Sequence, residues 1–256
     1  MSPTQLAISE QRRRSFSSPM SRPIVCLCVG LVFTVASVLP GASANGFTVS
    51  AEVKLVSSDN KQPVKDLSKS VIWLVPAESS FSPATNEDTH SRMAQKGKRF
   101  EPDLLVIPVG TYVDFPNLDP WFHNVFSLFR GKRFDLGLYQ AGAQRSVRFD
   151  KPGVSYLFCN IHPEMSAVVV AVESRWYAAS DASGKIRIPN VPGGKYVLHV
   201  WHENASPEML KSLERPIEIN DNRVLGSITL TIQPQNHGHQ NKYGKDYDPD
   251  SLKPDY

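Results

Sequence analysis

Cysteine is scarce in this chain of 256 residues, and its placement argues against a disulfide-stabilised fold. Two of the three cysteines, Cys26 and Cys28, lie in an apolar run near the N-terminus. If that run is removed on export, Cys159 is the only cysteine of the mature chain. A lone thiol cannot form an internal disulfide, and an exposed one is open to oxidation in an oxidising compartment. Cys159 is therefore either a metal ligand or an inert buried thiol.

Enzymatic signatures and a charge excess are missing as well. The sequence has no nucleophile with a matched base, no paired carboxylates and no glycine-rich loop for phosphate, so it predicts a protein that is not an enzyme. Four of the 28 basic residues and one of the 25 acidic residues lie in the first 44 positions, which leaves 24 of each. The mature chain is thus balanced, and nothing in it favours nucleic acid as a partner.

The first 44 residues are typical of an export signal. Four arginines precede an apolar run of 16 residues, 24–39, and Ala42-Ser43-Ala44 follows as a small-residue cleavage site. The run is short for a membrane span of about 20 residues, so a membrane association is expected only if the segment stays uncleaved. Arg13-Arg14-Ser15-Phe16 is similar to a twin-arginine signature, and an ordinary Sec signal is the alternative. We expect a periplasmic or otherwise exported protein.

The rest of the chain has the pattern of an all-β protein. Short apolar or alternating runs are separated by turns rich in proline and glycine, and no helical periodicity of useful length appears. The predicted strands are 47–56, 70–75, 104–107, 112–115, 144–149, 154–158, 166–172, 185–188, 195–201 and 224–232. One short helix is expected after Ser206, which can cap it, with Pro207 at its first position and Glu208 in its first turn.

One stretch, 158–165, combines three soft or borderline metal ligands. It reads Phe-Cys-Asn-Ile-His-Pro-Glu-Met and so has the spacing C-x2-H-x2-M. Copper uses thiolate, imidazole and a weak axial thioether, whereas zinc prefers four short bonds and has little use for methionine. A further strong ligand is available at His123. The residues His123, Cys159, His162 and Met165 therefore form a candidate blue-copper site for electron transfer.

This motif, with the upstream His123-Asn124, resembles that of small cupredoxins, and its loop length is similar to that of amicyanin. The segments 95–102, 105–110 and 113–117 also resemble strands of that fold, and the nearest likeness is to plastocyanin-like "methylamine utilization" proteins. The resemblance covers roughly 92–172 and implies a Greek-key β-sandwich with one type 1 copper. It also implies redox protein partners that dock near the exposed edge of a copper ligand.

A second resemblance lies on either side of the first. From Asp181 to Tyr196 the motif D-x-x-G-K followed by I-P-N-V-P-x-G-x-Y is similar to the second half of a carboxypeptidase regulatory-like, transthyretin-like β-sandwich, and 47–75 resembles its first half. The predicted organisation is a signal peptide (1–44), the first part of this sandwich (45–80), an inserted cupredoxin domain (90–173), the second part of the sandwich (174–232) and a disordered tail (233–256). In the alternative, sequential arrangement, 45–172 form one cupredoxin.

Several residues near the candidate ligands are given supporting roles. Asn124 is expected to hold the ligand loop by hydrogen bonding beside Cys159. Trp121, Phe122, Pro163 and Phe126 are expected around the exposed edge of His162, with plain core packing as the alternative.

The remaining histidines are weaker candidates for metal binding. His199 and His202 are expected at the surface of a strand, and His237 and His239 in a solvated tail.

The leading hypothesis is an exported one-electron carrier with one type 1 copper. Two alternatives stay open: a copper carrier or chaperone without redox cycling, and an extracytoplasmic scaffold or adhesion protein in which the metal is structural.

Overall fold

The computed structural model of the chain describes residues 46–59, 64–78, 89–128 and 131–233, together with 242, 243 and 245. All of them belong to one compact unit, 43–256. The predicted signal peptide 1–44 lies outside the described residues, as does most of the predicted tail 233–256, including His237 and His239.

The described residues contain no helix that combines the length and apolar character needed to cross a membrane.

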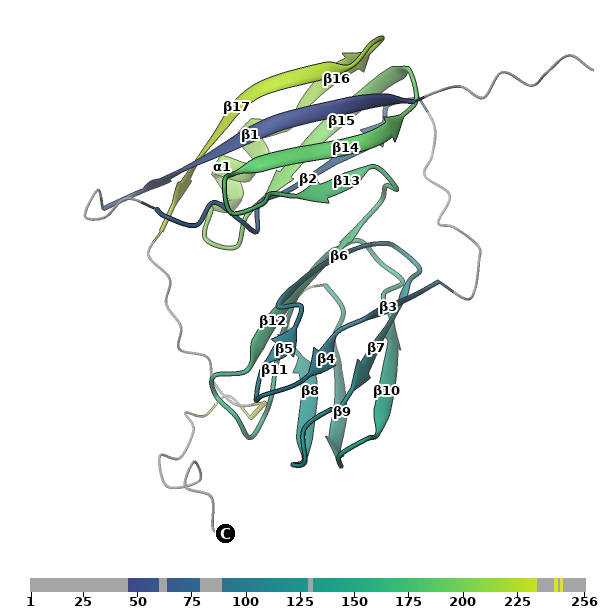
Figure 1. Cartoon of the computed structure of the whole chain (residues 1–256), viewed down its shortest axis with the longest axis vertical. Helices are drawn as coiled ribbons and strands as arrows, with labels where there is room; N and C mark the ends of the chain where they lie inside the picture. The colour runs from purple at the N-terminus through teal and green to yellow at the C-terminus, as the bar shows by residue number, and fades with distance from the viewer. Residues whose placement is uncertain are drawn as a thin grey trace, which may run out of the picture. The chain divides into compact units, whose positions relative to one another are not determined.

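Seven strands and the short helix form a first β-sandwich (Figure 1). One sheet has the order β14-β1-β17 and the other has the order β13-β2-β15-β16. The strands are β1 (Phe47–Ser57), β2 (Val71–Pro76), β13 (Tyr177–Ala179), β14 (Lys185–Val191), β15 (Gly194–Trp201), β16 (Arg215–Ile219) and β17 (Arg223–Ile232), and the helix is α1 (Pro207–Leu213).

The core of the first sandwich follows from alternation along its strands. In β1, Val49, Ala51 and Val53 are buried, whereas Glu52 and Lys54 between them are exposed. Because successive side chains of a strand point to opposite faces, one face of β1 packs inward. There it joins buried residues of β2, β14, β15 and β17 in one apolar cluster.

The strands between 90 and 172 form a second β-sandwich (Figure 1). Its larger sheet has the order β6-β12-β11-β8-β9, its smaller sheet has the order β10-β7-β3, and β4 pairs with β5 in a hairpin. The strands are β3 (His90–Arg92), β4 (Ala94–Gln95), β5 (Phe100–Glu101), β6 (Leu104–Pro108), β7 (Tyr112–Pro116), β8 (His123–Ser127), β9 (Phe134–Tyr139), β10 (Gln144–Arg148), β11 (Gly153–Phe158) and β12 (Ser166–Val172).

Strand β12 is buried on both faces, which explains its continuous apolar sequence. Ala167, Val169 and Ala171 face the core of the second sandwich. The alternate residues, among them Val170, belong to a third cluster that also contains Val71 and Trp201 of the first sandwich. A strand covered on both faces is apolar throughout rather than alternating.

The prediction of an all-β protein is confirmed. All ten predicted strands are present, with ends that differ by at most a few residues, and α1 begins at Pro207 as expected. The Ser206 hydroxyl accepts a hydrogen bond from the Met209 backbone N–H at 3.2 Å, so it is the N-cap. The pattern missed β8, β9, β13, β16 and the short strands β3, β4 and β5.

Candidate metal centre

The candidate ligands come from the ends of neighbouring strands. His123 is the first residue of β8, Cys159 directly follows β11, and Met165 directly precedes β12, with His162 in the loop between. Strand β11 pairs with β12 on one side and with β8 on the other. The order of strands in the larger sheet therefore brings the chain ends that carry these side chains together.

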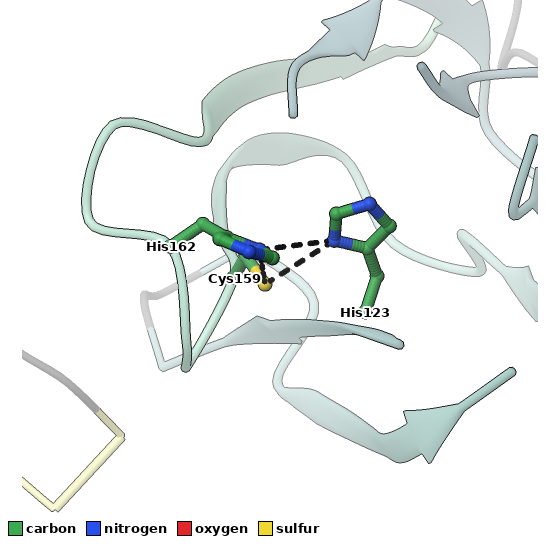
Figure 2. Close-up of side chains that lie close together, drawn as sticks. All are labelled: His123, Cys159 and His162. Atoms are coloured by element: carbon green, nitrogen blue, oxygen red, sulfur yellow. Dashed lines mark hydrogen bonds between the residues drawn. The ribbon is translucent and has the colours of Figure 1, made fainter. Parts of the chain in front are cut away.

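Three of the four predicted side chains converge on one point, as Figure 2 shows. The Nδ1 atoms of His123 and His162 are 3.1 Å apart. The Sγ atom of Cys159 lies 3.6 Å from Nδ1 of His162 and 4.0 Å from Nδ1 of His123. His123 and Cys159 are fully buried, whereas His162 is partly exposed. The cluster thus has a closed interior and one edge at the surface.

Met165 closes the ligand loop from below. Its backbone N–H donates to the His162 carbonyl at 3.0 Å, and its carbonyl accepts from the Cys159 N–H at 3.2 Å. The Met165 side chain is fully buried in the same apolar cluster as Cys159. Its role as an axial ligand stays a prediction.

Burial changes the protonation of the thiol and of the partly exposed imidazole. Burial raises the pKa of the Cys159 thiol, although the backbone N–H groups of Ile161, Asn124 and His162 oppose this shift. Burial also lowers the pKa of the His162 imidazole, and the neighbouring His123 adds to the shift. The neutral imidazole is therefore favoured, which is the form that binds a metal ion.

Asp119 is a site residue that the sequence analysis missed. Its Oδ2 atom lies 2.8 Å from Nε2 of His123, on the side of the ring away from Cys159, and both side chains are buried. Burial raises the pKa of Asp119, but hydrogen bonds from Lys98, His123 and Gly97 outweigh this, and the pKa lies below its usual value. The only signal in the sequence was an acidic residue four positions before the histidine.

The loop that carries Asp119 is held by Asn117. The Asn117 side chain accepts from the Asp119 N–H at 3.0 Å and donates to the carbonyls of Trp121 and Tyr139 at 2.7 and 3.3 Å. These bonds tie the segment before His123 to the end of β9. The path of the chain into the first candidate ligand is therefore fixed by a buried amide.

The predicted role of the Asn124 side chain is wrong. Its Nδ2 atom donates to Oδ1 of Asp135 at 2.7 Å and to the Gly137 carbonyl at 3.0 Å, both in β9, and not to the ligand loop. Its backbone N–H, by contrast, is a hydrogen-bond donor to the Cys159 sulfur. The side chain joins β8 to β9 where their register shifts between Asn124 and Phe126.

The predicted aromatic surround of His162 is only partly borne out. Phe126 is buried against Phe158, with ring centroids 5.9 Å apart, so it belongs to the core. Phe122 is 57% exposed, and Leu118 in the same loop is 51% exposed. Trp121 lies under the Lys98 ammonium at 5.6 Å, and Pro163 is partly buried. The loop 117–122 thus presents an apolar surface next to His123.

One described residue of the tail reaches the ligand loop. The Lys242 N–H donates to Oδ1 of Asn160 at 3.0 Å, and its Nζ atom lies 2.8 Å from Oδ2 of Asp135. Asn160 directly follows Cys159.

The remaining described histidines lie apart from this cluster. His90 pairs with Asp114 at 2.9 Å, and His199 stacks on Trp73 and pairs with Glu214 at 3.1 Å. His202 is buried, and its ring nitrogen accepts a hydrogen bond from the Asn204 N–H, so the expected surface position is wrong for this residue.

The chain is similar to three solved copper-protein structures. A purple cupredoxin from Nitrosopumilus maritimus is 26% identical, with 33% of this chain and 100% of that chain covered and a TM-score of 0.29. A reduced tryptophan-to-tyrosine mutant of amicyanin is 23% identical, with coverage of 40% and 98% and a TM-score of 0.32. The copper-containing nitrite reductase from Thermus scotoductus SA-01 is 21% identical, with coverage of 46% and 28% and a TM-score of 0.32.

No protein-family model matches the chain, and no curated protein matches it. Because the structural similarities have TM-scores near 0.3, the assignment of the site depends on the side chains described above.

Proposed function

We propose that the chain is an exported blue copper protein that carries one electron at a time between redox partners. One type 1 copper would be held by His123, Cys159, His162 and Met165. The observation that carries this proposal is the convergence of two imidazole nitrogens and one thiol sulfur at a largely buried point.

The spacing of the three atoms fits a single ion. Bonds from a metal to histidine nitrogen are about 2.0–2.1 Å and to thiolate sulfur about 2.3 Å, so two such atoms on one ion lie about 3–4 Å apart. The separations here are 3.1, 3.6 and 4.0 Å. The side chains would therefore need little movement to bind.

The kinds of donor favour copper over zinc. Structural zinc sites use four short bonds to Cys, His or carboxylate. Here the fourth side chain offered by the ligand loop is the thioether of Met165, which suits the long axial position of a blue-copper site. When bound, copper supplies a one-electron Cu(II)/Cu(I) couple.

The protein supplies position, exclusion of water and an exit for the electron. Burial of His123 and Cys159 keeps water from the sulfur and from one imidazole, and the strand ends limit how far the side chains can move. The partly exposed edge of His162 and the exposed Leu118 and Phe122 would form the contact surface for a redox partner. We propose no nucleic-acid partner, and membrane association only if the signal segment is uncleaved.

A chaperone that hands over copper is the competing function, and the burial of two ligands weighs against it because an incoming acceptor could reach only His162. The test is repeated reduction and reoxidation of the copper-loaded mature protein in the presence of a Cu(I) chelator. An electron carrier is expected to keep its copper through each cycle. Transfer of copper to the chelator on the first reduction would support the chaperone instead. Metal retention without any reversible redox change would support a structural metal.

A further inference from the structure

We propose that Asp119 is a positioning residue that fixes His123 in the tautomer and orientation needed for metal binding. The inference deepens the proposed function and rests on it, since it assigns His123 as a ligand through Nδ1. It concerns a buried carboxylate that lies outside the ligand set and connects it to a hairpin of the second sandwich.

The contact between the two side chains determines which nitrogen is free. A neutral imidazole has one N–H and one lone pair, and an ionised carboxylate only accepts hydrogen bonds. Oδ2 of Asp119 is 2.8 Å from Nε2 of His123, so the proton of His123 is on Nε2. The lone pair of Nδ1 is then directed toward Cys159 and His162, the other members of the cluster. Carboxylates in this position orient metal-ligating histidines and raise their basicity.

The carboxylate is itself held by the hairpin between β4 and β5. Its oxygens accept from the N–H groups of Gly97 at 2.6 Å and Lys98 at 2.9 Å. Both residues are in the left-handed region, with φ of 61° and 56°, and two backbone hydrogen bonds between Lys96 and Arg99 close the turn. A two-residue turn with positive φ at both positions is a common way to join hairpin strands. In this turn both central N–H groups point at Asp119.

Asparagine cannot replace the carboxylate here without loss. Oδ1 of Asp119 accepts one hydrogen bond, from Gly97, and Oδ2 accepts two, from Lys98 and from His123. An amide has one oxygen, so its NH2 group would face at least one of these donors. At a buried position, a donor without an acceptor costs about 1–3 kcal/mol. His123 can relieve the conflict by moving its proton to Nδ1, which removes the lone pair from the metal side.

The first experiment uses the metal-free wild-type protein and needs no variant. Long-range ¹⁵N–¹H NMR of the histidine rings reports which nitrogen carries the proton. The expected result for His123 is protonation at Nε2, and protonation at Nδ1 would overturn the proposal. Because no copper is present, this outcome does not depend on the proposed function.

The second experiment compares Asp119→Asn with a matched control, Asp114→Asn. Asp114 also contacts a histidine, His90 at 2.9 Å, but that pair lies outside the ligand cluster and is partly exposed. For Asp119→Asn we expect loss of the Nε2–H tautomer of His123, a Cu(I) affinity 10–100-fold weaker and a higher reduction potential. The control should leave all three unchanged.

The outcomes separate the two proposals. An Asp119→Asn protein that keeps the Nε2–H tautomer and the wild-type copper affinity would overturn the role of Asp119, as would equal effects of the two substitutions. If the wild type bound no copper but showed the Nε2–H tautomer and its loss in Asp119→Asn, the positioning of His123 would stand and the copper function would fall. If Asp119→Asn did not fold, the wild-type NMR result would still decide the proposal.

Discussion

His123 and Cys159 have no exposed surface, whereas one edge of His162 reaches solvent. This division assigns different tasks to similar ligands. The buried pair holds the ion and excludes water, and the exposed edge offers a short path for an electron to a docked partner. A site with three exposed ligands would lose these restraints, and a fully buried one would lengthen the path.

Met165 is predicted to tune the reduction potential more than it holds the metal. A long axial thioether bond adds little affinity but donates electron density to the ion. Met165→Leu is expected to keep copper with a higher potential, and Met165→Gln to keep it with a lower one, measured by voltammetry of the purified proteins. Met93→Leu is the matched control, since Met93 is fully buried in the same apolar cluster. Complete copper loss from Met165→Leu would contradict this account.

Asp135 is predicted to make part of the stability depend on pH. Burial raises its pKa, but hydrogen bonds from Lys242, Gly137 and Asn124 outweigh this and hold the pKa below its usual value. Its contribution is therefore present above the pKa of an unfolded aspartate, about 3.9, and is lost as the pH falls through the lower folded value. Asp135→Asn should lower the free energy of unfolding at pH 6 and have a smaller effect at pH 3, measured by urea denaturation. An equal effect at both pH values would refute the prediction.

At the scale of residues, sequence predicts a ligand set better than its surroundings. The spacing of Cys159, His162 and Met165 and the choice of His123 follow from which atoms copper accepts. Asp119 and Asn117 escaped because their partners, the turn at Gly97 and the end of β9, are distant in the sequence. Asn124 was given the wrong partner because its neighbours across β8 depend on register.

The elements around the site are arranged to stiffen a short loop. The segment 159–165 leaves β11 and enters β12, which pair along six residues each, and two backbone hydrogen bonds close it from inside. A loop tied at both ends and across its middle has few alternative conformations. Because copper prefers different geometries in its two oxidation states, a loop that moves little keeps the rearrangement on electron transfer small.

Ser206 is predicted to contribute to the stability of α1. This helix has only seven residues and no buried one, so it depends on its ends and on its contact with β15. Ser206→Ala should cost about 1 kcal/mol of unfolding free energy, because the Met209 N–H loses its acceptor. Ser212→Ala, within the same helix and exposed, is the control. A cost for the control as large as that for Ser206→Ala would show that the cap is unimportant.

Elements with a clear period were predictable and those without one were not. Strand β1 alternates and β12 is uniformly apolar, so both were found. Strand β8 is fully buried yet reads His-Asn-Val-Phe-Ser, because polar side chains at its start serve the site and Asn124 serves β9. Such a strand carries neither pattern.

For the whole molecule, the two sandwiches have separate main cores. The residues of one core cluster all lie within 93–171, and those of the other lie before 75 or after 175. Among the described strands, β1 and β2 pair only with strands that follow β12. These observations support the inserted arrangement, which we propose over the sequential one. An insertion leaves both cores intact when the ends of the interrupted loop are close together.

The fragment 90–173 is predicted to fold alone and bind copper, because its core lacks no residue of its own. It would expose apolar residues of β12 and β6 that belong to the third cluster, so we expect lower stability and solubility than in the full chain. Circular dichroism and copper titration measure both. A fragment 90–164, which lacks β12, is the control and should not fold. If 90–173 needed residues 47–75 to fold, the early strands would belong to the copper domain.

The visible absorption and EPR spectra of the copper-loaded mature protein, recorded beside those of Cys159→Ser, test the central claim most directly. A Cu(II) ion with a short thiolate bond gives an intense charge-transfer band, so the wild type is predicted to be strongly coloured with one copper per chain. Cys159→Ser should lose the band. A Cys159→Ser protein that kept the band, or a wild type that bound copper without it, would contradict the assignment of Cys159 as a ligand.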